Sequence, residues 1–344
     1  MAAPDLTEHR TARESLAWSK DLVDPALRAA VDTLPASMRR IAGYHLGWWD
    51  QHGGRGLAAA GKAVRPALTL LSAGAAGGSP REAIPAAVAV ELVHNFSLLH
   101  DDVMDGDATR RHRPTAWTLF GVGAAILAGD SLLTLALDVL AASGHPGAGP
   151  GMRMLSASVQ ELVDGQCADV SFEQRSTVDL AECEGMAAAK TAALMGCACA
   201  LGAFFGGADQ DRVARMRAFG EHLGLAYQHV DDLLGIWGDP ATTGKPVYSD
   251  LRNRKKSLPV VAALTSGTPA GRQLAGLFGR EGPLPEGDLA LAAELVEQAG
   301  GRARSQAQAD GLYTDAVRLL DSVGSNPAAA ELVGLARMVT RRDH

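Results

Sequence analysis

The sequence predicts an all-α fold, and three features of its 344 residues support this prediction. Alanine is abundant and aromatic residues make up only 5%, a composition that favours helices. Long apolar segments have the helical period, and they do not alternate with short strand-like segments as in a parallel-sheet protein. Loops rich in glycine and proline separate these segments. We therefore expect a single large helical domain over residues 1–344.

The predicted helices can be placed in order along the chain. The first is expected to begin near Ser79, because Ser79 and Glu82 have capping-box spacing and Pro80 suits a first turn. It should extend to Asp105, and the next clear loop is Ala142–Gly151. Three further helices are expected over Met154–Arg175, Ala187–Gly207 and Val213–Trp237. A second irregular region is expected over Gly267–Asp288, and the C-terminal helices over residues 285–344.

The composition also narrows the class of protein. Apolar residues make up 47% and charged residues 21%, as in soluble globular proteins, and the net charge of −7 argues against a general nucleic-acid binder. The four cysteines form no CxxC pair, which favours a reduced, cytoplasmic location. The N-terminal segment lacks the apolar core of a signal peptide. No uninterrupted apolar run reaches about 18 residues, so we expect no membrane span.

Two aspartate clusters dominate the polar pattern. The first acid motif, DDVMD, is Asp101–Asp105, and the second acid motif, DDLLG, is Asp231–Gly235. Helical positions i, i+1 and i+4 bring like charges together, where they repel one another. The segment before the first motif is strongly apolar, so a bound cation explains these acids better than the alternative, a solvated acidic face. Hard carboxylate oxygens favour Mg²⁺.

Basic residues near both motifs predict phosphate-bearing partners, since Mg²⁺ held by carboxylates keeps positions open for phosphate oxygens. These residues are Lys62, Arg65, Arg110, Arg111, Arg113, Lys190, Lys245, Lys255 and Lys256. For Lys190, in an apolar helix, the alternative is a side chain that extends to solvent. The two acid motifs and their cations together suggest a site for two polyanions, with metals shared between facing helices of a bundle.

With these motifs in order, the chain resembles the trans-isoprenyl diphosphate synthases, the polyprenyl synthetase family. The resemblance covers about residues 61–260 and rests on GKAVRP, ELVHNFSLLHDDVMDGDATRRHRPT, AILAGDSLL, LVDGQCAD, AAKTAAL, YQHVDDLLGIWGD, TGKPVYSDL and RKKSLPVV. It implies an all-α bundle of the isoprenoid synthase type around a deep apolar cavity, and a homodimer. The implied reaction condenses isopentenyl diphosphate with an allylic diphosphate through a Mg²⁺-assisted carbocation.

The resemblance also implies a role for each motif residue. Three Mg²⁺ ions, with Mn²⁺ as an alternative, would be held by Asp101, Asp102, Asp105, Asp231 and Asp232. The allylic diphosphate would contact Arg110, Lys190, Gln228 and Lys245. Isopentenyl diphosphate would contact Lys62, Arg65, His94 and Arg111, and Thr191 and Lys255 are further expected substrate-binding residues. The catalytic set is expected to be Asp101, Asp105, Lys190, Asp231 and Lys245.

Phe96 and Ser97 precede the first acid motif, at positions that help form the floor of the product tunnel in this family. One aromatic and one small residue there, with no insertion within DDVMD, most resemble a geranylgeranyl diphosphate synthase, and farnesyl diphosphate is the alternative product. The chain departs from the family at His112, which replaces a glycine, and at Gly235, which replaces the third acid of the second motif. A terpene cyclase on the same fold and a non-catalytic modulating subunit are therefore alternatives.

Overall fold

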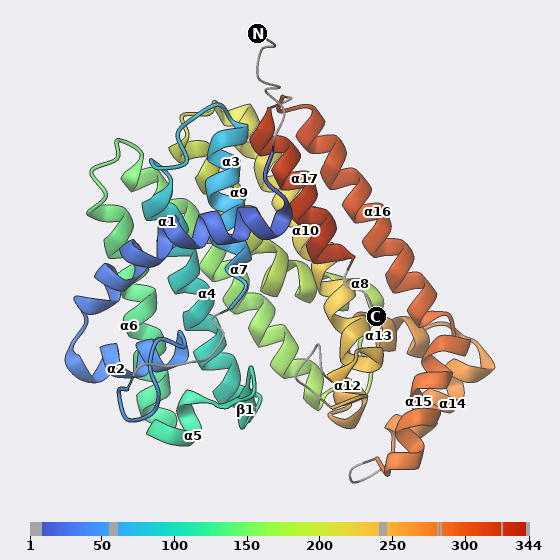
Figure 1. Ribbon diagram of the computed structural model, residues 1–344. Helices are drawn as coiled ribbons and strands as arrows, with labels where there is room; N and C mark the ends of the chain where they lie inside the picture. Colours follow the sequence, from blue (N-terminus) through green and yellow to red (C-terminus); the bar gives the residue numbers. More distant parts are fainter. Residues whose placement is uncertain are drawn as a thin grey trace. The chain divides into compact units, whose positions relative to one another are not determined.

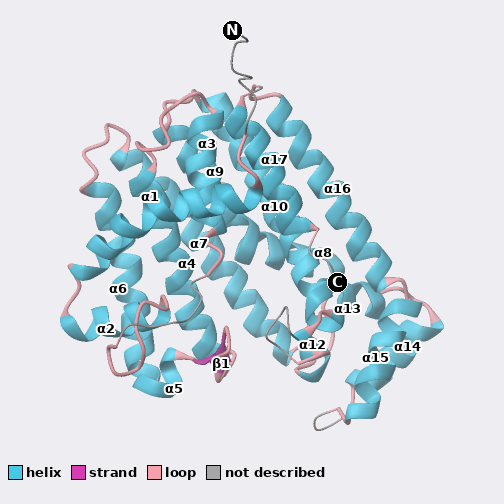
Figure 2. Cartoon of the chain, viewed as in Figure 1, coloured by secondary structure: helices cyan, strands magenta, loops and turns pink. Residues whose placement is uncertain are grey.

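The computed structural model describes residues 9–54, 61–240, 246–280, 282, 284–324 and 326–341. Helices dominate these residues, and the only strands among them are the short β1 (Thr109–Arg110) and β2 (Arg113–Pro114) (Figures 1 and 2). The prediction of an all-α fold is confirmed.

The residues group into two compact units. Unit 1 comprises Met1–Val159, Leu194–Gly220 and Leu319–Leu335, and unit 2 comprises Gln160–Ala193, Glu221–Arg318 and Ala336–His344. Two long helices, α7 (Ala148–Gln174) and α10 (Gln210–Trp237), contain residues of both units. The expectation of a single domain stays a prediction.

Unit 1 contains the N-terminal helices and the first acid motif. Its helices are α1 (Ala12–Asp32), α2 (Ala36–His45), α3 (Val64–Ala75), α4 (Ile84–Met104), α5 (Ala116–Phe120) and α6 (Val122–Ala141), with most of α9 (Ala193–Phe205) and of α17 (Pro327–Thr340). Helix α4 packs against α1, α3 and α6 (Figure 1). It is buried on nearly every side, as its almost continuous apolar sequence predicts.

Helices α4 and α6 approach closely because α6 has small residues on the contact side. A Cβ atom at Gly129 would clash with the imidazole of His100. The glycine therefore lets His100 lie against α6, where its Nε2 is 3.0 Å from the carbonyl oxygen of Ile126. This contact fixes the last turns of α4, which hold the first acid motif.

The start of α4 corrects the sequence prediction. The helix begins at Ile84 rather than near Ser79, and the preceding residues form successive turns in which the amide of Glu82 donates to the carbonyl of Ser79. Pro85 explains the difference, because proline lacks an N–H group and suits the first helical turn, whereas a position deeper in a helix is costly.

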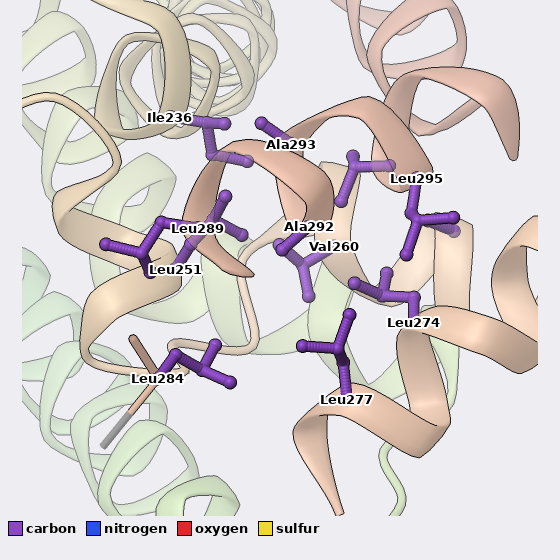
Figure 3. Close-up of a cluster of buried hydrophobic side chains, with 12 residues drawn as sticks. Ile236, Leu251, Val260, Leu274, Leu277, Leu284, Leu289, Ala292, Ala293 and Leu295 are labelled. Atoms are coloured by element: carbon purple, nitrogen blue, oxygen red, sulfur yellow. The ribbon is translucent and has the colours of Figure 1, made fainter. Parts of the chain in front are cut away.

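Unit 2 contains the second acid motif and an apolar core of its own. Its helices are α8 (Leu180–Ala187), the π-helix η1 (Ala188–Ala192), α12 (Ser249–Arg252), α13 (Leu258–Leu264), α14 (Pro269–Phe278), α15 (Glu286–Gln298) and most of α16 (Gly301–Asp321). Figure 3 shows Ile236, at the end of α10, with leucine and valine side chains from α12 to α15. This core holds the end of α10 against the short helix α12.

The region Gly267–Asp288 is not irregular throughout, as the sequence suggested, because it contains α14. Thr268 caps this helix by accepting a hydrogen bond from the amide of Gly271 at 3.0 Å, and Pro269 occupies the first turn. Glycine and proline in this region suggested a loop, but Pro269 instead marks the start of a helix. The other predicted helices correspond to η1 with α9, to α10, which begins at Gln210, and to α7, which begins at Ala148 inside the predicted loop Ala142–Gly151.

Two helical segments are long and apolar enough to cross a membrane, by length and composition alone. Leu180–Phe205 is mostly buried inside the protein, as core helices of soluble proteins are, whereas Val122–Ala141 keeps an exposed apolar face. The expectation of no membrane span therefore stays a prediction.

Candidate active site

The first acid motif forms the last turn of α4. Asp102 is buried, Asp101 is half-buried and Asp105 is exposed at the C-cap, where its amide donates to the carbonyl of Asp101 at 2.8 Å. The C-terminal end of a helix carries partial negative charge, so three carboxylates there are electrostatically unfavourable unless cations accompany them. The position of the motif therefore supports the prediction that it binds cations.

Asp102 forms an ion pair with the side chain of Arg110. Arg110 Nε donates to Asp102 Oδ1 at 2.6 Å, and the other oxygen, Oδ2, is buried and accepts no hydrogen bond from any described residue. Burial raises the pKa of Asp102 to about 6, although the neighbouring Arg110 guanidinium lowers it. Asp102 thus anchors Arg110, and the metal prediction for this motif rests mainly on Asp101 and Asp105.

The β1–β2 hairpin presents the arginines that follow the motif. Arg110 pairs with Arg113, and the two residues between them, Arg111 and His112, have φ values of 52° and 60°. Both values lie in the left-handed region that a type I′ turn requires at its central positions. His112 therefore keeps the turn in place of the family's glycine, at a cost in backbone strain that glycine avoids.

A cavity in unit 1 lies beside Asp102 and is strongly cationic. Its lining includes Arg110, Arg111, Arg113 and His45. The pKa of His45 falls to about 3 because the ring is buried and the neighbouring arginines disfavour a further positive charge. An electropositive cavity of this kind is suited to anions with several oxygens, such as a diphosphate.

Three of the four residues predicted to bind isopentenyl diphosphate meet in unit 1. Arg65, in the first turn of α3, has its Nη1 atom 3.3 Å from Nε2 of His94 on α4. Burial and the charges of Arg65 and Arg111 lower the pKa of His94 well below its ordinary value, so the ring is neutral. A Cβ at Gly61 would lie 2.5 Å from Nη2 of Arg111, so glycine makes room for that guanidinium. Lys62 is the next residue along.

Lys190 lies in unit 2, in the π-helix η1. A Cβ at Gly165 of α7 would collide with the backbone nitrogen of Lys190, so this glycine allows the close approach of the two segments. Lys190 Nζ forms an ion pair with Asp169 Oδ2 at 2.6 Å, and both side chains are largely buried. This pairing contradicts the alternative that Lys190 merely extends to solvent. Irregular π-helical turns are frequent at functional sites.

A chain of hydrogen bonds links η1 to the second acid motif. Thr191 Oγ1 donates to Gln228 Oε1 at 2.7 Å, and Gln228 Nε2 donates to Asp232 Oδ1 at 2.7 Å. The amide of Leu258 donates to Asp232 Oδ2 at 2.9 Å. Both oxygens of the buried Asp232 are therefore engaged within the protein, whereas Asp231 beside it is exposed. The geometry favours Asp231 over Asp232 as a metal ligand.

Lys255 is a half-buried cation of unit 2 that lies among acidic side chains. Burial alone lowers the pKa of a lysine, but the carboxylates of Asp250, Asp232, Asp169 and Asp231 outweigh that effect and raise the pKa of Lys255. Burial also raises the pKa of Asp232 to about 7, opposed first by Lys255. Asp169 and Asp250 belong to the landmarks LVDGQCAD and TGKPVYSDL, but no role was predicted for either residue.

The acids offer oxygen ligands only, which suits Mg²⁺. Among the described residues, no three acidic, histidine or cysteine side chains converge as a ready-made metal centre. Magnesium sites built from one or two carboxylates complete their coordination with water and substrate phosphates, so the residues fit ions that bind together with a diphosphate. Lys245, predicted to be catalytic, lies outside the described residues.

The predicted chain-length residues lie on α4, one turn or more before the first acid. Phe96 is 6% exposed, and its ring meets that of His100 edge-on with centroids 4.8 Å apart. Ser97 is half-buried and its Oγ donates to the carbonyl of His94 at 2.9 Å. A large and a small side chain are thus placed side by side below the acid motif.

Comparison with known proteins agrees with this geometry. Residues 48–296 match the family model for polyprenyl synthetase. The chain is 48% identical to (2E,6E)-farnesyl diphosphate synthase and 44% identical to geranylgeranyl diphosphate synthase, both of Mycobacterium tuberculosis H37Rv. The alignments cover 95% and 93% of this chain and 92% and 91% of the relatives, respectively.

Among solved structures, a polyprenyl synthetase from Streptomyces coelicolor A3(2) matches with a TM-score of 0.90 and 46% identity, covering 95% of this chain and 98% of the other. A geranylgeranyl pyrophosphate synthetase from Pyrococcus horikoshii matches with a TM-score of 0.86 and 31% identity, covering 96% and 99%. The resemblance indicated by the motifs is confirmed: the chain belongs to the polyprenyl synthetase family of trans-prenyltransferases.

Proposed function

We propose that the protein condenses isopentenyl diphosphate with an allylic diphosphate to make a short-chain all-trans prenyl diphosphate, most consistent with geranylgeranyl diphosphate. The observation that carries this proposal is the Arg65–His94 contact beside the first acid motif. A chain-elongating enzyme needs a second diphosphate site of this kind, whereas a cyclase, which acts on one diphosphate, does not.

The proposed chemistry follows from the charges. Asp101, Asp105 and Asp231 would hold Mg²⁺, three ions with Mn²⁺ as an alternative, and bound metal would stabilise the negative charge of the leaving diphosphate. Lys190, preorganised by Asp169, would stabilise the same charge by hydrogen bonding. Arg110 and Lys245 are assigned the same task.

The remaining steps would need no protein nucleophile. The double bond of isopentenyl diphosphate, held by Lys62, Arg65, His94 and Arg111, would attack the allylic carbon. The proton then lost would pass to the departing diphosphate. The neutral state of His94 makes the ring a hydrogen-bonding group rather than a further cation.

The product length rests on Phe96 and Ser97. A single aromatic ring with a small neighbour supports a C20 product, and the relative named geranylgeranyl diphosphate synthase is consistent with it. The relative named farnesyl diphosphate synthase, at 48% identity, favours the shorter C15 product as the second candidate.

Substituting Phe96 with leucine or alanine should lengthen the main product by at least one C5 unit, because the ring no longer blocks the growing chain. Mass spectrometry of the dephosphorylated products measures this. Removing a buried Phe side chain costs about 3–5 kcal/mol when alanine replaces it, so leucine is the safer variant. The control is Phe205→Leu, which alters an equally buried ring in α9. Identical products from Phe96→Leu and the unsubstituted chain would refute this role.

The central test is incubation with Mg²⁺ and dimethylallyl, geranyl or farnesyl diphosphate, with and without isopentenyl diphosphate. Elongated product only when isopentenyl diphosphate is present supports the proposal. Hydrocarbon formed without it would instead indicate a terpene cyclase. No turnover under either condition would indicate a non-catalytic subunit.

We further propose a cytoplasmic homodimer. Val122, Ile126 and Leu127 are exposed apolar residues on one helix, α6, and a second copy of the chain would cover them. The free cysteines among the described residues support a reducing compartment. A monomeric mass in analytical ultracentrifugation would contradict the dimer, and recovery in the membrane fraction would contradict the location.

A further inference from the structure

Gly235 occupies the position at which the second acid motif would have its third carboxylate. The carboxylate of Asp250 fills the space that a side chain at position 235 would need. A Cβ atom at position 235 would lie 2.5 Å from the carboxyl carbon of Asp250 and closer still to its Oδ2 atom. These separations are shorter than van der Waals contact allows. A side chain at 235 and the Asp250 carboxylate therefore cannot both occupy their present positions.

The backbone around Asp250 is fixed by several contacts, and Ser249 Oγ lies 3.4 Å from the Asp250 carboxylate oxygen Oδ1. The helix that carries it, α12, is tied to the end of α10, because Tyr248 N donates to the Ile236 carbonyl at 3.2 Å and Ser249 Oγ donates to the Gly235 carbonyl at 3.1 Å. Asp250 itself is only 9% exposed. Tyr248 adopts a left-handed conformation with φ of 62°, a strained state that the surrounding structure must stabilise.

The electrostatic surroundings also connect Asp250 with the second acid motif. Lys255, which follows α12, interacts with Asp250 and with both aspartates of the motif, and its amide donates to the carbonyl of Asp250 at 2.8 Å. Position 235 follows Asp231 by four residues, so the two positions share one face of α10. The Asp250 carboxylate therefore lies at the face of α10 on which Asp231 is located.

We propose that Asp250 supplies the third carboxylate of the second acid motif, from α12 instead of α10, and that Gly235 is glycine because this carboxylate needs its space. Asp250 acts as a positioning residue for the diphosphate-bound cation at Asp231. The proposal rests on the proposed function, in which Asp231 holds Mg²⁺. It also replaces the simpler view that the third acid has been lost without compensation.

The steric part is tested by a double-mutant cycle with Gly235→Ala, Asp250→Gly and the pair together. Alanine normally stabilises a helix relative to glycine, so Gly311→Ala, in the open interior of α16, should leave Tm unchanged or raise it. Gly235→Ala should lower Tm by about 2 °C or more, and this loss should disappear when Asp250 is already glycine. A Gly235→Ala variant as stable as the Gly311→Ala variant would overturn the proposal.

The functional part is tested by calorimetric titration with inorganic pyrophosphate at saturating Mg²⁺. Asp250→Gly should weaken binding about tenfold or more, as loss of an orienting partner of a metal ligand typically does. The exchanged variant Gly235→Asp/Asp250→Gly should recover binding to within about threefold, which a purely structural role for Asp250 would not produce. The control, Glu286→Ala, removes the partner of Arg252 on α12 but leaves Asp250 in place.

Undiminished binding by Asp250→Gly, no recovery by the exchanged variant, or no Mg²⁺-dependent pyrophosphate binding by the unsubstituted chain would each overturn the proposal. Turnover is not the readout, so failure of the proposed function can be distinguished. A chain that binds Mg²⁺ and pyrophosphate, shows the recovery, and makes no prenyl product contradicts the proposed function alone.

Discussion

Replacing Asp231 with alanine is expected to abolish turnover and to leave the fold intact. Asp231 is the exposed acid of the second motif, and its buried neighbour Asp232 has both oxygens engaged by Gln228 and Leu258. The metal at this motif therefore depends on Asp231. Loss of one preorganised electrostatic partner of a reacting group typically lowers kcat by about 10²- to 10³-fold. Steady-state kinetics with an allylic substrate, isopentenyl diphosphate and saturating Mg²⁺ measures this effect.

Stability should not fall in the same variant. Alanine is the best helix former, which offsets the loss of the least influential of the four carboxylates near Lys255. Tm should therefore be unchanged or slightly higher. Asp211→Ala, an exposed substitution in the first turn of the same helix, is the matched control and should retain full activity. A kcat of Asp231→Ala within about threefold of the unsubstituted chain would contradict the assignment of the metal to this motif.

The sequence was sufficient for those features that depend on local pattern. Apolar periodicity located α4 and α10, and it placed both acid motifs near helix ends. The basic residues around GKAVRP and the paired arginines predicted a phosphate site, which stays a prediction, and Arg65, His94 and Arg111 of that set meet in unit 1. Local pattern worked here because each motif lies within a single helix or beside its end.

Features that depend on contacts between distant segments could not be predicted in this way. Both acid motifs contain two adjacent aspartates, and spacing does not reveal which one turns inward. Asp232 is buried because the amide of Leu258, 26 residues away, caps its carboxylate. The π-helical turn at Lys190 likewise requires Gly165 on another helix. A helical wheel of η1 or α10 alone shows neither Gly165 nor Leu258, because both residues lie on other segments.

The prediction that α4 begins near Ser79 was wrong for a different reason. Ser79, Pro80 and Glu82 satisfy a local helix-start pattern, but Pro85 satisfies the same rule five residues later. Only one proline can occupy a first turn, and a second inside the helix costs about 3 kcal/mol. The later proline therefore sets the boundary. Weighing the two prolines against each other favours the later start, although α1 accommodates Pro25 in its interior.

Replacing Asp232 with alanine is expected to have the opposite effect from replacing Asp231, because it should chiefly lower stability. The substitution leaves Gln228 Nε2 and the amide of Leu258 without their acceptor in a buried place. Each buried donor left unsatisfied costs about 1–3 kcal/mol, so the loss of two should lower the free energy of unfolding by about 2–6 kcal/mol. Lys255 also loses one of its neighbouring carboxylates, which adds to the cost. Urea unfolding followed by circular dichroism measures the change.

The variant Asp232→Asn keeps the shape of the side chain and changes its hydrogen-bonding groups, so it separates the two contributions to stability. The amide keeps one acceptor oxygen, which can serve either Gln228 or Leu258, but its NH₂ group then faces the other donor. About half of the stability loss should therefore remain. Asp231→Asn, at the exposed neighbouring position, is the matched control and should unfold at the same urea concentration as the unsubstituted chain. If Asp232→Ala were as stable as Asp231→Asn, the buried hydrogen bonds would contribute nothing. Asp232 would then have to be reconsidered as a metal ligand equal to Asp231.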